Sequence, residues 1–186
     1  MDFYAEVYKY LRSEKSAFLD DMIENALKQA RKLSPRTFSA FSQAEAREDG
    51  IITDFFKLEG RLVKRVFSGA AAALFMAVTL GFDAEIYIKQ AFAEGALSGT
   101  VMDAVLSATA EQAVEELQAS ELSKLKIYRA GMRISPGFGD FSLDKQRDFM
   151  SAFGLSARLG LYLNDEFMLT PQKTVTAVLP LFSDKQ

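Results

Sequence analysis

The sequence predicts an α+β fold in one compact domain. Helical and extended patterns are mixed along the 186 residues, without the strict β-α-β alternation that is typical of a parallel sheet. The apolar residues between Arg12 and Leu33 follow the i, i+3, i+4, i+7 spacing of one helical face. Between Lys126 and Ile134 the apolar residues instead alternate with other residues, as in a strand. We expect residues 1–50 to form a helical segment with a strand, and residues 51–186 to form the core.

The first helical pattern is flanked by shorter elements. Tyr4 to Leu11 is rich in aromatic residues and fits either a short strand or the start of a helix. The helix at 12–33 should end before Pro35, because the residue that precedes a proline is disfavoured in the α conformation. Thr37 to Ser42 alternates and is expected to be a half-buried strand. The charged residues 44–50 end in Asp49-Gly50, which should form a turn.

The core is expected to contain a strand that is buried on both faces, because the second half of Ala70 to Leu80 lacks polar alternation. Asp83 suits the N-cap of a helix that runs to about Glu94, and Thr100 to Asp103 matches a capping box that opens the next helix. The further elements that we expect are strands at 51–58 and 62–66, of which the second also fits a helix start, a break at 95–99, a helix at 101–118, a helix at 143–153 capped by Ser142, and strands at 158–163 and 175–182.

Several classes of function are excluded by residue types that the chain lacks. It has no cysteine and no histidine, which removes thiolate and imidazole metal ligands, a cysteine nucleophile and a Ser-His-Asp triad. A carboxylate-only Mg²⁺ or Ca²⁺ site remains open, although no D-x-D-x-D-G loop occurs. The lack of a clear acid pair argues against a small enzyme that uses paired carboxylates. The net charge is −3 without a basic block, so we expect no nucleic-acid binding.

The chain is expected to be soluble and cytoplasmic. Met1-Asp2-Phe3-Tyr4 lacks the basic and apolar regions of a signal peptide. The longest apolar run, Gly69 to Phe82, is shorter than the ~20 residues that a helix needs to cross a bilayer. We therefore expect no membrane partner.

The most distinctive stretch is Arg-Ile-Ser-Pro-Gly-Phe-Gly-Asp at 133–140. Pro136-Gly137 fits a type II turn, because proline presets one φ and glycine accepts the positive φ of the next position. Gly139 permits a second close approach of the backbone. The preceding strand should place Arg133 on the face opposite its apolar row, which comprises Tyr128, Ala130, Met132 and Ile134. The stretch is either a simple turn or a loop that offers backbone groups and Arg133 to a ligand.

Four other side chains are candidates for ligand binding, each with a structural alternative. Phe138 fits either a ring that stacks on a flat ligand or a core residue. Glu111 lies at the margin of the apolar face of its helix, where it is either a solvated edge residue or a ligand contact. Lys173 and Thr174 begin a Lys-Thr-Val-Thr segment that fits a hydrogen-bonding site or an ordinary strand. The guanidinium of Arg133 suits a carboxylate or a phosphate.

Taken in order, these segments resemble the activation domain of vitamin B12-dependent methionine synthase, in a free-standing form. The strongest match is 133–140 with Leu143 and Gln146 downstream, against the family pattern Arg-x-Ser-Pro-Gly-Tyr-Gly-Asp with a following Gln. The other matches, in chain order, are 77–81, Ala110-Glu111 and 168–176. The resemblance covers most of the chain from about Gly50 onward. It implies a mixed, largely antiparallel sheet with flanking helices.

By this resemblance the chain binds S-adenosylmethionine. Arg133 would hold the methionine carboxylate, and Glu111 would reach polar atoms of the ligand from a neighbouring helix. The backbone of the turn would line the adenosine. The residues that we expect to bind the ligand are Arg133, Ser135, Pro136, Gly137, Phe138, Gly139, Glu111, Lys173 and Thr174.

The activity of the family is repair, in which cob(II)alamin is reduced by one electron and methylated from S-adenosylmethionine. The resemblance implies an accessory subunit that acts in trans on a cobalamin-dependent methionine synthase or another corrinoid protein. That partner would carry the cobalamin, and an electron-donor protein would be a further partner. The family tyrosine is replaced by Phe138 here, so any hydrogen bond from its hydroxyl is lost. The alternative function is therefore a non-catalytic scaffold for a corrinoid protein or methyltransferase, with weak or lost S-adenosylmethionine binding.

Overall fold

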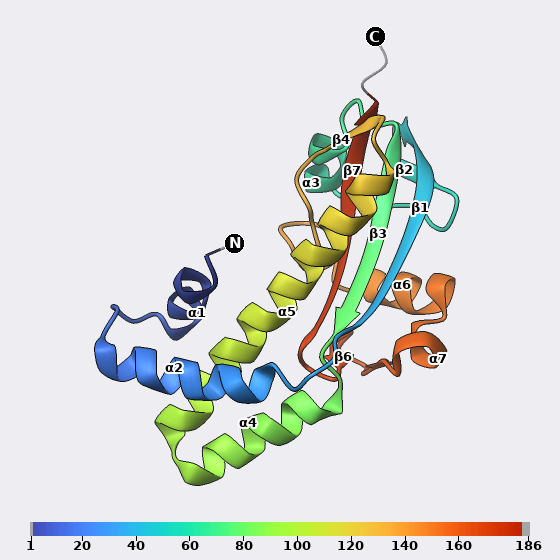
Figure 1. Ribbon diagram of the computed structural model, residues 1–186. Coiled ribbons are helices and arrows are strands. Elements are labelled where there is room, and N and C mark those ends of the chain that lie inside the picture. Colours follow the sequence, from blue (N-terminus) through green and yellow to red (C-terminus); the bar gives the residue numbers. More distant parts are fainter. Residues whose placement is uncertain (1, 184–186) are drawn as a thin grey trace.

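A five-stranded antiparallel sheet forms the centre of this computed structural model, which describes residues 2–183 (Figure 1). The strand order is β2-β1-β3-β7-β4, and all four neighbouring pairs are antiparallel. In that order the strands are β2 (Gly50–Thr53), β1 (Arg36–Arg47), β3 (Ala72–Thr79), β7 (Thr174–Ser183) and β4 (Tyr128–Ala130). A separate two-stranded ribbon pairs β5 (Tyr162–Leu163) with β6 (Leu169–Thr170). The predicted α+β class and largely antiparallel sheet are confirmed.

The central strand β3 is buried along its whole length because helices cover both faces of the sheet. Leu74 and Met76 pack with residues of the long helix α5 (Ala96–Lys124) on one face. Ala73 and Phe75 pack into a second cluster on the other face. Successive side chains of a strand point to opposite faces, so both sets must be apolar. This explains why the sequence lacks polar alternation here, as predicted.

Three helices gather around the N-terminal half of α5. They are α1 (Phe3–Leu11), α2 (Ala17–Ala30) and α4 (Phe82–Glu94). Their buried residues share one apolar cluster with α5, which includes Val7, Ile23, Ile88 and Val105. Figure 1 shows this group at one end of α5, beside the sheet and not over it. These three helices therefore pack on the part of α5 that extends beyond the strands of the sheet.

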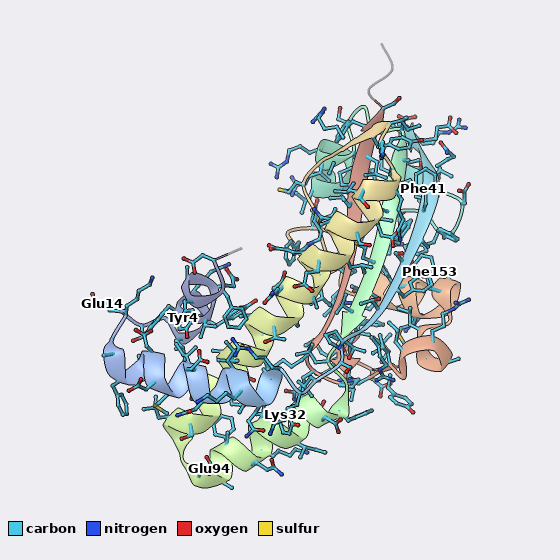
Figure 2. All side chains as sticks on the ribbon, in the orientation of Figure 1. Tyr4, Glu14, Lys32, Phe41, Glu94 and Phe153 are labelled. Carbon is cyan, nitrogen blue, oxygen red and sulfur yellow. The ribbon has the colours of Figure 1, made fainter. Side chains whose placement is uncertain are left out.

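The opposite face of the sheet is covered by three short helices and an aromatic core. The helices are α3 (Arg61–Val66), α6 (Lys145–Phe153) and α7 (Leu155–Leu159). The ring of Phe75 from β3 lies 5.6 Å from that of Phe149 and 5.2 Å from that of Phe153, between ring centroids. Phe153 lies on the α6 side of the sheet (Figure 2). This aromatic contact anchors the end of the 133–153 segment to the sheet.

The predicted capping box at Thr100 is wrong, because α5 already begins at Ala96. Gly95 alone separates α4 from α5, with an extended backbone at φ 161° and ψ 154°. Thr100 lies inside the helix, and its hydroxyl donates to the Ala96 carbonyl one turn earlier. Gly99 is needed there because the Phe92 ring fills the space that a Cβ would occupy. Close packing of α4 on α5 therefore decides where the helix begins, and α5 runs past the predicted end at 118.

Near the N-terminus, the boundaries differ from those predicted. Tyr4 to Leu11 is helical, and Arg12 ends α1 in the left-handed conformation with φ 52°. The predicted helix at 12–33 starts only after Ser16, whose hydroxyl accepts from the Leu19 N–H. Residues 44–47 extend β1, so the turn is confined to Glu48 and Asp49. The end of α1 and the start of α2 therefore depend on local capping, which hydrophobic spacing alone does not predict.

Further along the chain, several predicted strands are short or absent. Residues 62–66 belong to the helix α3, and β2 ends at Thr53 with only one further bridge between Ile51 and Leu58. Of the strand predicted at 158–163, the first two residues belong to α7, and only Tyr162–Leu163 are extended, as β5. The helix predicted from 143 begins at Lys145 without a cap from Ser142, and α4 is preceded by Gly81, not capped by Asp83. The strand expected at 175–182 is confirmed as β7.

Candidate functional site

Arg133 lies where the chain leaves the sheet between β4 and α6. The Gly131 N–H donates to the Pro180 carbonyl, and Ile134 exchanges two hydrogen bonds with Val178. Between these anchors, Met132 points to solvent and is 53% exposed. The chain crosses the sheet here, because Tyr128 and Ala130 pack on the α5 side while Ile134 packs into the cluster on the other side. The predicted single row from Tyr128 to Ile134 is therefore wrong.

Arg133 forms an ion pair with Glu111 of α5. Its Nη2 donates to the Glu111 Oε2 over 2.6 Å, and the two side chains are 22% and 28% exposed. The prediction that Arg133 lies opposite the apolar row is also wrong, since it faces the same helix as Tyr128 and Ala130. The second terminal nitrogen, Nη1, is buried and has no hydrogen-bond partner among the described residues. The pair thus retains donor capacity at a half-buried position, where an anion would gain most from it.

The loop after Arg133 forms a compact turn held by its own backbone. The Phe138 N–H donates to the Ser135 carbonyl, the Gly137 N–H to the Phe141 carbonyl, and the Phe141 N–H to the Phe138 carbonyl. Gly137 has φ 94°, which favours glycine as the sequence predicted. Because these N–H groups are already used inside the turn, they are not free to line an adenosine. Pro136 is buried against the sheet side, and Gly139 lies next to Leu62.

The aromatic ring of Phe138 is 55% exposed. This excludes the interpretation of Phe138 as a core residue. An exposed ring on a rigid turn presents an apolar face on which a flat ligand stacks. Of the turn residues, Phe138 is therefore the one whose side chain is available to a ligand.

Asp140 ends the turn with a structural role that the sequence did not reveal. Its carboxylate accepts from the backbone N–H groups of Leu62 and Arg61, over 2.9 and 2.7 Å, at the start of α3. These two bonds lower the pKa of Asp140 from 3.8 to about 2, with a smaller contribution from the Arg61 side chain. Gly60 allows the approach, because a Cβ there would lie 2.8 Å from the Asp140 carbonyl oxygen. No local signal could identify this cap, since 79 residues separate Arg61 from Asp140.

Lys173 reaches the same face of α5 as Arg133. Its Nζ lies 2.8 Å from both the Asp103 Oδ1 and the Ser107 Oγ, and its side chain is only 11% exposed. Asp103, Ser107 and Glu111 are spaced by four residues, so they follow one face of the helix over about 12 Å. Two ion pairs, one from the loop and one from the start of β7, therefore flank a polar strip on α5.

Thr174 does not join this strip. Its hydroxyl donates to the Thr79 hydroxyl of β3 over 2.8 Å. Thr176, two residues on, donates to the buried Gln146 of α6 over 2.6 Å. Alternation along β7 therefore directs both threonines to the α6 face, whereas Lys173 points to α5. Of the residues predicted to bind a ligand, the structure pairs Arg133 with Glu111, places Lys173 on the same face of α5, and leaves the Thr174 side chain on the opposite side of the sheet.

A cavity of about 600 Å³ is lined by Arg61, Leu62, Arg65, Gly139 and Asp140, so it reaches the end of the 133–140 loop but not Arg133. Another, of about 400 Å³, opens between α2, α4 and α5, and its lining includes Met22, Tyr87 and Met102 but none of the predicted site residues. The chemistry of the Arg133 and Glu111 pair, and not cavity size, therefore marks the candidate site. Across residues 2–183 no cluster of three acidic side chains could hold a metal ion. None of the described helices combines the length and apolarity that a bilayer span requires.

Comparison with known proteins bears on this geometry. No protein-family model matches the sequence, and the search of curated proteins found no match. Among solved structures, the chain is similar to one described as the MetH reactivation domain bound to AdoHcy, with a TM-score of 0.69. The alignment covers 96% of this chain and 70% of that chain, with 16% sequence identity. This chain has the fold of the methionine synthase reactivation domain.

The reactivation-domain fold confirms the resemblance that the 133–140 segment suggested. At 16% sequence identity, the similarity is one of backbone fold. The fold brings the Arg133 side chain to α5, where it pairs with Glu111, while the turn that follows lies next to Leu62 and Leu143. The roles of the individual residues depend on the contacts described above.

Proposed function

We propose that this protein binds S-adenosylmethionine beside α5 and acts in trans as an activation subunit of a cobalamin-dependent methionine synthase. The observation that carries the proposal is the half-buried Arg133, which Glu111 orients while the Nη1 donor has no partner in the described part of the chain. A buried guanidinium with unused donors is suited to a carboxylate, such as that of a bound amino acid. The structural neighbour is described with AdoHcy bound, which supports a ligand of this class.

The residues present fit the two ends of such a ligand. The methionine carboxylate would meet Arg133, and the positive ammonium or sulfonium would be attracted to Glu111. The exposed ring of Phe138 would stack on the adenine. Bound S-adenosylmethionine would supply an activated methyl group, because its positively charged sulfonium leaves as a neutral thioether when the methyl group is transferred. The part of this chain is to bind and orient the ligand so that the methyl group faces a partner.

Cobalamin would be carried by that partner. The 186 residues contain no histidine, so they cannot provide an imidazole to cobalt. The partner is therefore proposed to be a corrinoid-carrying methyltransferase, with an electron donor that supplies the single electron needed for reductive methylation. This assigns the present chain an accessory role in which the reacting cobalt lies outside it.

Isothermal titration calorimetry tests the ligand. We expect S-adenosylmethionine and S-adenosylhomocysteine to bind with 1:1 stoichiometry, because both carry the carboxylate and the adenosine. Adenosine, which carries neither the amino-acid carboxylate nor a phosphate for Arg133, serves as the control and should bind more weakly. If no heat is measured with millimolar S-adenosylmethionine, with or without a corrinoid protein, ligand binding is ruled out.

The trans activity requires a separate assay. A cobalamin-dependent methionine synthase from which the activation domain has been removed is trapped in the cob(II)alamin form and mixed with this protein, S-adenosylmethionine and a one-electron reductant. We expect the visible spectrum of methylcobalamin to appear only when this protein is present. A spectrum that stays that of cob(II)alamin contradicts the trans role even if the ligand binds.

The alternative function is a scaffold that contacts a corrinoid protein without using S-adenosylmethionine. The observation that favours it is Phe138, whose ring carries no hydroxyl to bond a ligand and is exposed enough to meet a protein. A pull-down of a corrinoid protein whose yield is the same with and without S-adenosylmethionine would support the scaffold. A yield that rises with the ligand would support the activation subunit.

A further inference from the structure

The cavity between α2, α4 and α5 exists because short side chains face one another where the three helices meet. Ala26 of α2, Ala91 of α4 and Val101 of α5 line it, and all three are buried in one apolar cluster. Figure 1 shows α2 and α4 on the same end of α5. The space that remains, about 400 Å³, falls in the range of small-molecule sites, which is roughly 300–1,000 Å³.

Each of the three helices also contributes one larger side chain to the lining. These side chains are Met22 of α2, Tyr87 of α4 and Met102 of α5. Methionine thioethers are flexible and polarisable, so they adapt to apolar groups of different shape. The face of a tyrosine ring packs on apolar groups and also attracts cations. The cavity therefore suits a ligand with an apolar body, and its aromatic side chain tolerates a positive charge.

Three polar groups of the lining have no structural role. The Glu94 carboxylate and the hydroxyls of Tyr87 and Ser98 have no hydrogen-bond or ion-pair partner within residues 2–183. Glu94 also does not cap α5, whose start has no side-chain cap. Polar groups that converge on an apolar cavity without holding the fold together are typical of a binding site.

The charge of the lining is negative. Among the described residues that line the cavity, Glu94 alone is charged at neutral pH. Lys28 and Lys32 are exposed and lie outside the lining, where they donate to the amide oxygens of Asn25 and Gln29 over 3.1 and 2.7 Å. Figure 2 shows Lys32 near the end of α2 and Glu94 at the opposite end of this helix pair, where α4 meets α5. A cation that enters beside Glu94 is therefore attracted to it.

We propose that this cavity is a second ligand site, which binds a small organic cation with an apolar body, such as an arylalkyl ammonium ion. The ammonium group lies beside Glu94, and the apolar body lies between Met22 and Met102. This site is separate from the one proposed around Arg133. Met102 and Glu111 are nine residues apart on α5, or about 14 Å along the helix.

The location of the ligand is tested by NMR with 2-phenylethylamine, which is protonated at neutral pH, as the probe. The chain has seven methionines, so labelling their methyl groups with ¹³C gives few signals, which single Met→Leu variants assign. The probe should shift the Met22 and Met102 signals in a saturable way. Met132, which is exposed beside Arg133, is the internal control, and its signal should stay in place.

The charge preference is tested with two compounds that keep the phenylethyl body. The neutral 2-phenylethanol should bind roughly three- to tenfold more weakly than the amine, and the anionic 3-phenylpropionate more weakly still. Glu94→Gln should lower the affinity for the amine to that for the alcohol, because it removes the charge and keeps the shape of the side chain. Glu121→Gln is the matched control, since Glu121 pairs with Lys124 at the far end of α5.

Two results would overturn the inference. If millimolar amine leaves the Met22 and Met102 signals in place, or shifts only the Met132 signal, the cavity is not its site. If the three compounds bind equally well, or if Glu94→Gln keeps the preference for the amine, the assigned class of ligand is wrong. Saturable shifts of Met22 and Met102 with a preference for the amine that depends on Glu94 support the inference, whatever the protein does with S-adenosylmethionine.

Discussion

Arg133 and Glu111 are 22 residues apart in the sequence and are held together by a 2.6 Å hydrogen bond between the β4–α6 loop and α5. Both side chains are less than one third exposed. The carboxylate fixes one edge of the guanidinium, and the buried Nη1 on the other side lacks a hydrogen-bond partner among residues 2–183. An ion pair with an unfilled donor is compatible with the anion site that we propose here.

Arg133→Ala should weaken S-adenosylmethionine binding by about 2–4 kcal/mol, since it leaves a desolvated carboxylate without its charged partner. Calorimetry would show this as a roughly 30- to 1,000-fold rise in the dissociation constant. Arg129→Ala is the control, because Arg129 lies on the ring of Phe182 at the edge strand β4. Equal affinity of Arg133→Ala and the wild type would remove Arg133 from the site.

Glu111→Gln tests whether the acid orients the arginine. The substitution keeps the shape of the side chain but leaves Arg133 with a weaker, neutral partner. We expect a loss of about 1 kcal/mol in the free energy of unfolding, measured with urea, together with weaker ligand binding. Glu116→Gln serves as the control, since Glu116 accepts only from Gln112 on the exposed side of the same helix. An unchanged affinity for Glu111→Gln would show that Arg133 is positioned without it.

Asp140 should make stability depend on pH in acid. The two backbone N–H groups of α3 lower its pKa to about 2 in the folded protein, against 3.8 for the free group. A depressed folded-state pKa stabilises the fold above pH 3.8, and that contribution is lost as the pH falls toward 2. Urea midpoints measured from pH 5 to pH 2 should therefore fall for the wild type, and less steeply for Asp140→Asn. Asp165→Asn, which removes an exposed carboxylate on the β5–β6 turn, provides the comparison. Identical slopes for wild type and Asp140→Asn would contradict the assignment.

Gly60→Ala should disturb the support of the candidate loop. Gly60 has φ 120°, and a Cβ would meet the Asp140 carbonyl oxygen at 2.8 Å, so the backbone must shift. We expect a loss of about 2 kcal/mol in the free energy of unfolding, from strain and the weakened cap. Gly95→Ala is the matched control, because its backbone is extended and nothing lies within 4 Å of the added carbon. If thermal denaturation shows the same midpoint for both variants, the close contact of Gly60 with the loop is not required.

The sequence predicted much of the sheet and its class, and missed boundaries that depend on distant contacts. The apolar run at 70–80 and the strand pattern at 175–182 predicted β3 and β7, because strands that are buried on both faces carry apolar residues without polar alternation. The sequence left 62–66 open between a strand and the start of a helix, since the cap of α3 is Asp140 from far along the chain. Similarly, the start of α5 depends on Phe92 packing against Gly99, a contact between helices that a local capping pattern in the sequence cannot predict.

For the candidate site, the sequence by itself determined which chemistry is available. It placed Arg133 before a Pro-Gly turn, required glycine at 137, and excluded histidine and cysteine chemistry altogether. Only the tertiary structure decided which of these groups meet. It paired Arg133 with Glu111 and turned Thr174 toward α6. The physical reason is that backbone conformation is encoded within a few residues, whereas an ion pair between a loop and a helix depends on how the sheet and α5 pack together.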